Sequence, residues 1–210
     1  MEIFMEDQAI KKRREDKYIA KTVDYNLIKS KIVKMGFKKA HRSNYVNNIY
    51  YDFNDQSFIE NIEGETNRTK YRLRWYDNKE GFVIEVKEKN GKTGYKQKTS
   101  LKSLKKIQLD KEINKILPSK YKERITNRYF REYFIKEDIR ITLDSNLKFK
   151  LPNHKNFKRF SDLIIEVKYP INAIYNEEII KNLGLKLVKF SKFSKGISFL
   201  RNYKSLTKLI

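Results

Sequence analysis

Basic side chains alternate with apolar ones along several stretches of this sequence. In residues 70–75, Lys70, Arg72 and Arg74 occupy every second position. If this stretch is a β-strand, the three side chains share one face, because successive side chains of a strand point to opposite faces. Four further stretches repeat the pattern, at Lys87 and Lys89, at Lys96 and Lys98, at Arg140, and at Lys168. Repeated cationic faces repel one another unless an anion lies among them.

The few acidic residues on these faces suggest which anion the basic residues bind. Single carboxylates lie among the basic residues at Glu85, Asp144 and Glu166. Arginine binds phosphate oxygens with two parallel hydrogen bonds, and lysine supplies a point charge. A carboxylate can hold Mg²⁺ or Mn²⁺, which also bridges phosphate oxygens. The pattern therefore favours a phosphate chain with a divalent metal, and phosphoryl transfer needs mainly positioning and charge stabilisation from the protein.

The overall composition agrees with a polyanionic partner. The 210 residues include 48 Lys and Arg against 26 Asp and Glu, which gives a net charge of +22. Such an excess favours binding of nucleic acid, anionic membranes or phosphate chains, although part of it reflects a composition rich in Lys, Asn and Ile. The absence of cysteine excludes disulfides and thiolate sites and is compatible with a cytoplasmic location.

Strands dominate the elements that must position these residues. Alternating patterns between turn residues predict eight strands, with helices between residues 24 and 36, across 103–126, before Gly184 and at the C-terminus. The class is α+β with an antiparallel sheet or barrel. We expect a lead-in over residues 1–12 and a single domain over 13–210. The predicted strands are residues 17–23, 45–53, 69–76, 81–89, 95–101, 128–136, 139–144 and 163–169, and a further short strand is expected around 187–190.

Five groups of residues together resemble a known family. They are 13–18 (RREDKY), 48–52 (NIYYD), 70–76 (KYRLRWY) with 85–87 (EVK), 129–131 (YFR) with 140–144 (RITLD), and 165–168 (IEVK) with 189–193 (KFSKF). Their order and spacing resemble the VTC domain, the polyphosphate polymerase module of the vacuolar transporter chaperone complex and its bacterial relatives, within the triphosphate tunnel metalloenzyme superfamily.

The resemblance implies a closed, eight-stranded antiparallel barrel tunnel with flanking helices. It implies transfer of the γ-phosphate of ATP onto a growing polyphosphate chain, with Mn²⁺ or Mg²⁺. Carried over residue by residue, the catalytic positions are Lys17, Arg72, Arg74, Lys87, Arg131 and Arg140, the substrate-binding positions are Lys96, Tyr129, Lys189, Ser191 and Lys192, and the metal ligand is Glu166. Lys98 competes with Lys96 for its position, and Lys195 competes with Lys189 and Lys192.

Two other functions remain open. Tunnel-fold triphosphatases begin with E-x-E-x-K, whereas residues 13–17 place Arg13 at the first acidic position. Because hydrolysis needs carboxylates to hold metal and orient water, polymerase is favoured over triphosphatase. A non-enzymatic domain binding polyanions or nucleic acid is the second alternative, although no nucleic-acid motif supports it and no nucleic-acid partner is expected. The family implies a cytoplasmic enzyme, either alone or with a membrane-protein partner.

Overall fold

The computed structural model describes residues 13–90, 93–101, 106–170 and 176–201, so the predicted lead-in lies outside the described part. The strands are β1 (Arg13–Lys21), β2 (Lys38–Lys39), β3 (Asn44–Asp52), β4 (Arg68–Tyr76), β5 (Lys79–Asn90), β6 (Thr93–Leu101), β7 (Lys122–Lys136), β8 (Ile139–Lys150), β9 (Lys158–Arg159) and β10 (Asp162–Pro170). The helices are α1 (Tyr25–Lys34), α2 (Gln56–Glu63), α3 (Lys106–Ile116), α4 (Asn176–Leu183) and α5 (Lys192–Arg201). Among these described helices, none is long and apolar enough to cross a membrane.

The strands form one mostly antiparallel sheet, which confirms the predicted α+β class. Eight of them follow the order β1-β10-β8-β7-β3-β4-β5-β6, with β2 beside β7 and β9 beside β8. Each of the eight longer predicted strands corresponds to one strand of this order, whereas the short strand expected around 187–190 is reduced to a single bridge between Leu187 and Tyr18. β2 and β9 were missed because each is only two residues long, too short to show an alternating pattern.

The prediction of a closed barrel is wrong. In the described part of the chain, the sheet has two ends, β1 and β6. The outer edge of β1 is already occupied, because the amide of Val188 donates to the carbonyl of Lys17 at 2.9 Å and Leu187 forms a bridge with Tyr18. β6 carries exposed lysines at positions 96 and 98, a composition typical of strands that remain sheet edges.

The chain divides into two compact units, which we describe separately. Unit 1 comprises Met1–Asn44, Tyr129–Leu147 and Phe160–Phe190, and unit 2 comprises Tyr45–Arg128, Lys148–Arg159 and Ser191–Ile210.

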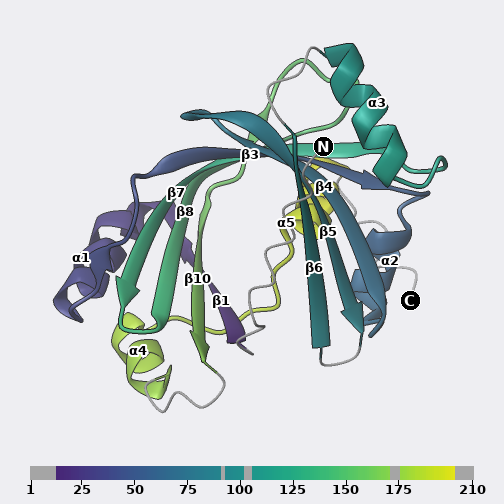
Figure 1. Ribbon diagram of the computed structural model, residues 1–210. Coiled ribbons are helices and arrows are strands. Elements are labelled where there is room, and N and C mark those ends of the chain that lie inside the picture. The colour runs from purple at the N-terminus through teal and green to yellow at the C-terminus, as the bar shows by residue number, and fades with distance from the viewer. Residues whose placement is uncertain (1–12, 91–92, 102–105, 171–175, 202–210) are drawn as a thin grey trace. The chain divides into compact units, whose positions relative to one another are not determined.

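In unit 1, one face of the strands packs against α1 and α4. The apolar positions of β1, β8 and β10 alternate with polar ones, and side chains such as Tyr18, Ile141 and Ile165 are fully buried. Ile28 and Ile32 of α1 join this core, and Figure 1 shows α1 and α4 beside each other next to β7 and β8. The opposite strand face is therefore left for the charged residues.

In unit 2, α3 covers the apolar face of β4 and β5. Leu109 and Ile113 of α3 pack against Leu73 and Ile84, and Figure 1 shows this helix close to these strands. The apolar core thus holds the odd-numbered positions of β4 on one side, so that Arg72 and Arg74 point to the other.

Helix α5 packs closely against the strands of unit 2. Gly196 is buried, and a methyl group added at its Cα would lie 2.5 Å from side-chain carbons of Ile125 and Phe149. Only glycine allows so close an approach without displacing its neighbours. This contact sets the distance between α5 and the strands, and it thereby sets the position of Ser191 just before the helix.

Candidate functional site

Three basic side chains of unit 2 surround the buried carboxylate of Glu85. The register of β4 and β5 places Arg72 directly opposite Glu85, and the Arg72 Nε donates a hydrogen bond to it. Lys96 Nζ lies 2.6 Å from a carboxylate oxygen of Glu85, and Arg74 Nη1 lies 3.7 Å from the same oxygen. Arg72, Arg74 and Lys96 are all predicted phosphate ligands, and the structure brings them together.

The three cations outnumber their carboxylate, and the pKa values reflect this. Burial alone would raise the pKa of Glu85, but Arg72, Arg74 and Lys96 outweigh burial and hold it well below its usual range. Partial burial of its ammonium group lowers the pKa of Lys96, whose side chain is 36% exposed, to about 8; Glu85 opposes this shift, while Arg72 and Arg74 add to it. With one negative and three positive groups, the cluster retains a positive charge that a phosphate could neutralise.

Two uncharged side chains accept hydrogen bonds from Arg72 and Arg74. Asn48 lies opposite Arg74 in the register of β3 and β4, and its Oδ1 accepts a hydrogen bond from Arg74 Nε at 2.8 Å. The hydroxyl of Tyr50 accepts from Arg72 Nη1 at 3.4 Å. These contacts orient the guanidinium groups before any ligand binds.

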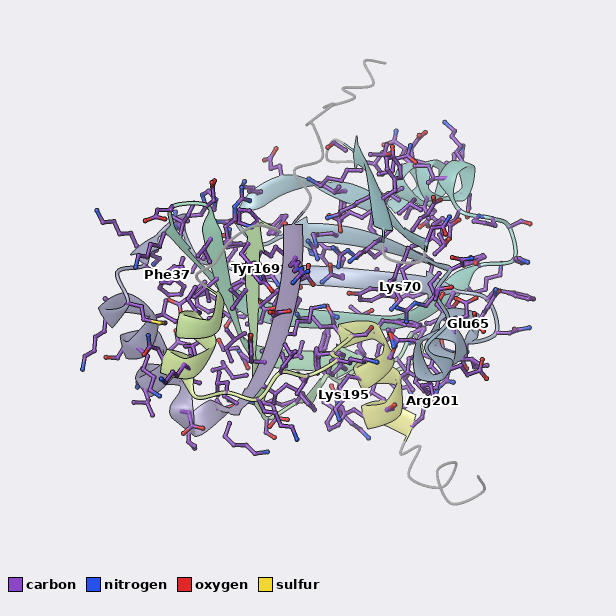
Figure 2. The ribbon with its side chains drawn as sticks, turned by 90° about the horizontal axis from the view of Figure 1, so that it is seen from below. Phe37, Glu65, Lys70, Tyr169, Lys195 and Arg201 are labelled. Carbon is purple, nitrogen blue, oxygen red and sulfur yellow. The ribbon has the colours of Figure 1, made fainter. Side chains whose placement is uncertain are left out.

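The start of α5 adds hydroxyl and ammonium groups on this side of unit 2. Ser191 caps the helix, accepting a hydrogen bond from the Ser194 amide at 3.3 Å, and Lys70 Nζ lies 3.2 Å from the Ser191 Oγ. The ring of Phe193 packs against Tyr50 with centroids 5.5 Å apart. Figure 2 shows Lys70 on its strand and Lys195 on α5. Ser191 therefore lies next to Lys70, a basic residue of the expected cationic face that was not assigned a role in the site.

In unit 1, Arg131 and Asp144 form a buried, bidentate ion pair. Arg131 Nε and Nη2 lie 2.5 and 2.6 Å from the two oxygens of Asp144, whose side chain is fully buried. Burial opposes the charge on Arg131, but Asp144 outweighs burial and keeps the pKa of the guanidinium well above its usual value. The guanidinium also lies 5.2 Å from the ring centre of buried Tyr129.

Two carboxylates of unit 1 lie between two lysines on β1 and β10. The register pairs Lys17 with Glu166 and Glu15 with Lys168. Lys17 Nζ is 2.9 Å from Glu15, and Lys168 Nζ is 2.8 Å from Glu166 and 3.3 Å from Glu15. Burial and the neighbouring Glu166 raise the pKa of Glu15, but Lys17 and Lys168 outweigh them and lower it.

This pair of carboxylates suits a hard divalent cation. In the described residues, no group of three or more metal-ligating side chains occurs. Mg²⁺ bound together with phosphates commonly takes only one or two carboxylates from the protein, with phosphate oxygens completing its shell. The donor set of Glu15 and Glu166 fits that arrangement, and it includes one acid more than the single Glu166 expected from the sequence.

The remaining predicted residues occupy the same strand faces or lie nearby. Lys87 is exposed on the face of β5 that carries Glu85, and Arg140 is exposed opposite Lys168. Lys192 is the first residue of α5. Lys189 is exposed, and Lys17 Nζ donates to the adjacent carbonyl of Phe190 at 3.1 Å. Lys96, rather than Lys98, reaches Glu85.

Several residues of these clusters, including Glu15, Lys70 and Asn48, were not assigned a role from the sequence. Glu15 could have been found, because it lies two positions before Lys17 and therefore on the same strand face. Lys70 lies on the same strand face as Arg72 and Arg74, but the spacing of residues in the sequence does not reveal its contact with Ser191. No local pattern gave Asn48 a role, because a buried amide depends on contacts between strands far apart in the chain; its Nδ2 donates to the Oδ1 of Asn127 at 2.8 Å.

The sequence matches the model of one known protein family. The model of the VTC domain family matches residues 12–201, nearly the whole chain. No curated protein matches the sequence significantly.

Several solved structures share the fold at low sequence identity. The PH1819 protein of Pyrococcus horikoshii OT3 superposes with a TM-score of 0.56 and 15% identity, covering 87% of this chain and 97% of that one. A putative adenylate cyclase from Vibrio parahaemolyticus gives 0.55 and 13%, covering 89% and 97%. A putative adenylyl cyclase from Hippeastrum, described as having a dominant triphosphatase activity, gives 0.52 and 11%, covering 88% and 96%. At these identities, the likeness concerns the fold alone.

Proposed function

Because the chain belongs to the VTC domain family, we propose that it is a polyphosphate polymerase that uses ATP. The observation that carries the proposal is the cluster of Arg72, Arg74 and Lys96 around one buried carboxylate. Such a cluster suits a highly charged phosphate chain, because it combines bidentate guanidinium groups with a point charge and keeps a positive excess. We propose that residues 13–210 act as one catalytic domain.

The proposed reaction lengthens a polyphosphate chain by one unit. A terminal oxygen of the chain attacks the γ-phosphorus of ATP and forms a new P–O bond. The bond from this phosphorus to the bridging β–γ oxygen breaks, and ADP leaves with the electron pair. The protein contributes positioning and charge stabilisation rather than a covalent intermediate.

The proposed roles are those that the family resemblance implies, grouped by unit. In unit 2, Arg72, Arg74, Lys87 and Lys96 bind phosphate oxygens, and Ser191 and Lys192 add a hydroxyl and a charge at the start of α5. In unit 1, Lys17, Arg131 and Arg140 are the proposed phosphate-binding cations, with Tyr129 beside Arg131 and Lys189 near Lys17. Glu166, with Glu15, would hold Mn²⁺ or Mg²⁺, which supplies neutralisation of phosphate charge when bound.

Hydrolysis of a triphosphate is the competing function, and one observation favours it. Glu15 lies close enough to Glu166 to share Lys168 with it, so this site holds two carboxylates. A hydrolase needs such groups to hold metal and orient water. The two functions differ in the acceptor, which is water in one case and a phosphate chain in the other.

A product assay tests the proposal. Purified protein with ATP and Mn²⁺ should release ADP and form chains that gel electrophoresis resolves as a ladder. Arg72→Gln should abolish the ladder. Arg128→Gln is the matched control, since Arg128 pairs with Asp77 at the surface of the same unit, and it should keep full activity. Release of free phosphate without a ladder would assign the triphosphatase reaction instead.

A further inference from the structure

Two buried amides form a chain of hydrogen bonds behind Arg74. Arg74 Nε donates to Asn48 Oδ1 at 2.8 Å, and Asn48 Nδ2 donates to Asn127 Oδ1, also at 2.8 Å. Asn48 and Asn127 are both fully buried, and Arg74 is nearly so. All three lie in unit 2, on β4, β3 and β7.

Arg74 determines the donor and acceptor of each of these hydrogen bonds. A guanidinium can only donate hydrogen bonds, so Asn48 must present its oxygen to Arg74 and its amide nitrogen to Asn127. Asn127 must in turn present its oxygen to Asn48. Its own nitrogen is then left buried without an acceptor among the described residues. A buried, unpaired donor is unfavourable for folding, so the arrangement is not the most stable one available at these positions.

An aspartate at position 48 would lessen this cost. Its two oxygens could accept from Arg74 and from the Asn127 nitrogen after the Asn127 amide turns over. The Asn127 oxygen would then be the unpaired atom, and an under-satisfied buried carbonyl is tolerated more often than an unpaired buried N–H group. However, its negative charge would also cancel the charge of Arg74. The neutral Asn48 anchors the guanidinium and leaves its positive charge in the cluster with Arg72, Lys96 and Glu85.

We propose that Asn48 and Asn127 are positioning residues that hold Arg74 in a phosphate-binding orientation without neutralising it. The inference rests on the proposed function, since it takes the phosphate chain as the ligand of Arg74. In this account, the buried unpaired amide of Asn127 is kept because the alternative, a carboxylate beside Arg74, would weaken anion binding.

The Asn48→Asp variant tests this, because the proposal gives its two effects opposite signs. We expect a thermal midpoint at or above that of the wild type, and at least tenfold weaker binding of inorganic tripolyphosphate by titration calorimetry. If Asn48 had a purely structural role, the affinity would stay the same. Unchanged affinity in the folded variant overturns the proposal.

A second variant keeps the test decisive if Asn48→Asp does not fold. In Asn48→Leu/Asn127→Leu, apolar groups of similar size replace both partners of the inner hydrogen bond, so that neither amide is left unpaired; Arg74 Nε loses its acceptor, so a moderate loss of stability is expected. Arg74 loses its anchor but keeps its charge, so we expect tripolyphosphate binding to weaken about fivefold. Affinity within twofold of the wild type would overturn the proposal.

Two controls separate this inference from the proposed function. Asn47 lies next to Asn48 but on the other strand face, where its Nδ2 donates to Asp77 at 2.7 Å; Asn47→Leu should leave the tripolyphosphate affinity unchanged. Arg74→Ala should weaken binding strongly. If Arg74→Ala has no effect, the proposed function of this cluster fails; if it weakens binding but neither Asn48 variant does, only the positioning role fails.

Discussion

Replacing Arg131 with methionine should destabilise the protein strongly, because the buried, charged Asp144 loses both hydrogen bonds from the Arg131 guanidinium. Asp144 is fully buried, and Arg131 contacts both of its oxygens, at 2.5 and 2.6 Å. Breaking a buried ion pair by removing one partner costs about 3–5 kcal/mol. For a chain of this length, about 2–4 °C of thermal midpoint is lost per kcal/mol, so a decrease of roughly 6–20 °C is expected.

The double variant Arg131→Met/Asp144→Leu separates structure from catalysis. Replacing both members of a buried ion pair with apolar residues of similar volume is often neutral or stabilising, so the thermal midpoint should return close to that of the wild type. Polymerase activity should remain lost, because the proposed phosphate contact of Arg131 is absent from both variants. The assays are calorimetric unfolding and the polyphosphate ladder. A single variant within about 1 kcal/mol of the wild type, or an active double variant, would refute this reasoning.

Three further predictions concern the other clusters. Binding of tripolyphosphate should weaken as the pH rises through the Lys96 pKa of about 8, because deprotonation removes a phosphate-binding charge; in Lys96→Arg, calorimetry should show a smaller pH dependence. Gly196→Ala should lower stability by about 1–3 kcal/mol in denaturant unfolding, because the added methyl group overpacks against Ile125 and Phe149; a change under about 0.5 kcal/mol would show that α5 can move away. Glu15→Gln should raise the Mn²⁺ concentration needed for half-maximal activity, and an unchanged requirement would exclude Glu15 as a metal ligand.

The sequence predicted the strands well, because alternation is a local property. Eight stretches of alternating apolar and polar residues all became strands of the sheet, and the apolar faces pack against helices in both units. Helix α2 was missed, since its eight residues (QSFIENIE) are too few for a clear helical period. Its start is instead determined by buried Asp52, which accepts hydrogen bonds from the Ser57 amide and hydroxyl.

Closure of the sheet could not be derived from alternation. Whether two edge strands meet depends on what else occupies their edges, and here residues 187–188 bond to the outer edge of β1. The resemblance to tunnel proteins suggested a complete barrel, but the pairing described for this chain stops at β1 and β6.

The candidate site was predictable in its charges but not in its contacts. The alternation of side chains along each strand was enough to place Arg72, Arg74 and Lys96 on common faces. Their convergence on Glu85 depends on the register between three strands and on the diagonal reach of Lys96, since Lys98 is the residue directly opposite Glu85. The buried amides of Asn48 and Asn127 meet across 79 residues of sequence, which no local pattern reveals.

The most direct test of the central claim follows the γ-phosphate of ATP. With ATP radiolabelled at the γ-position and Mn²⁺, we predict that the label enters chains longer than ATP while the ADP formed carries none. With ATP labelled at the α-position, the label should stay in ADP. Recovery of the γ-label entirely as inorganic phosphate would contradict the account, because it would show that water, rather than a phosphate chain, is the acceptor.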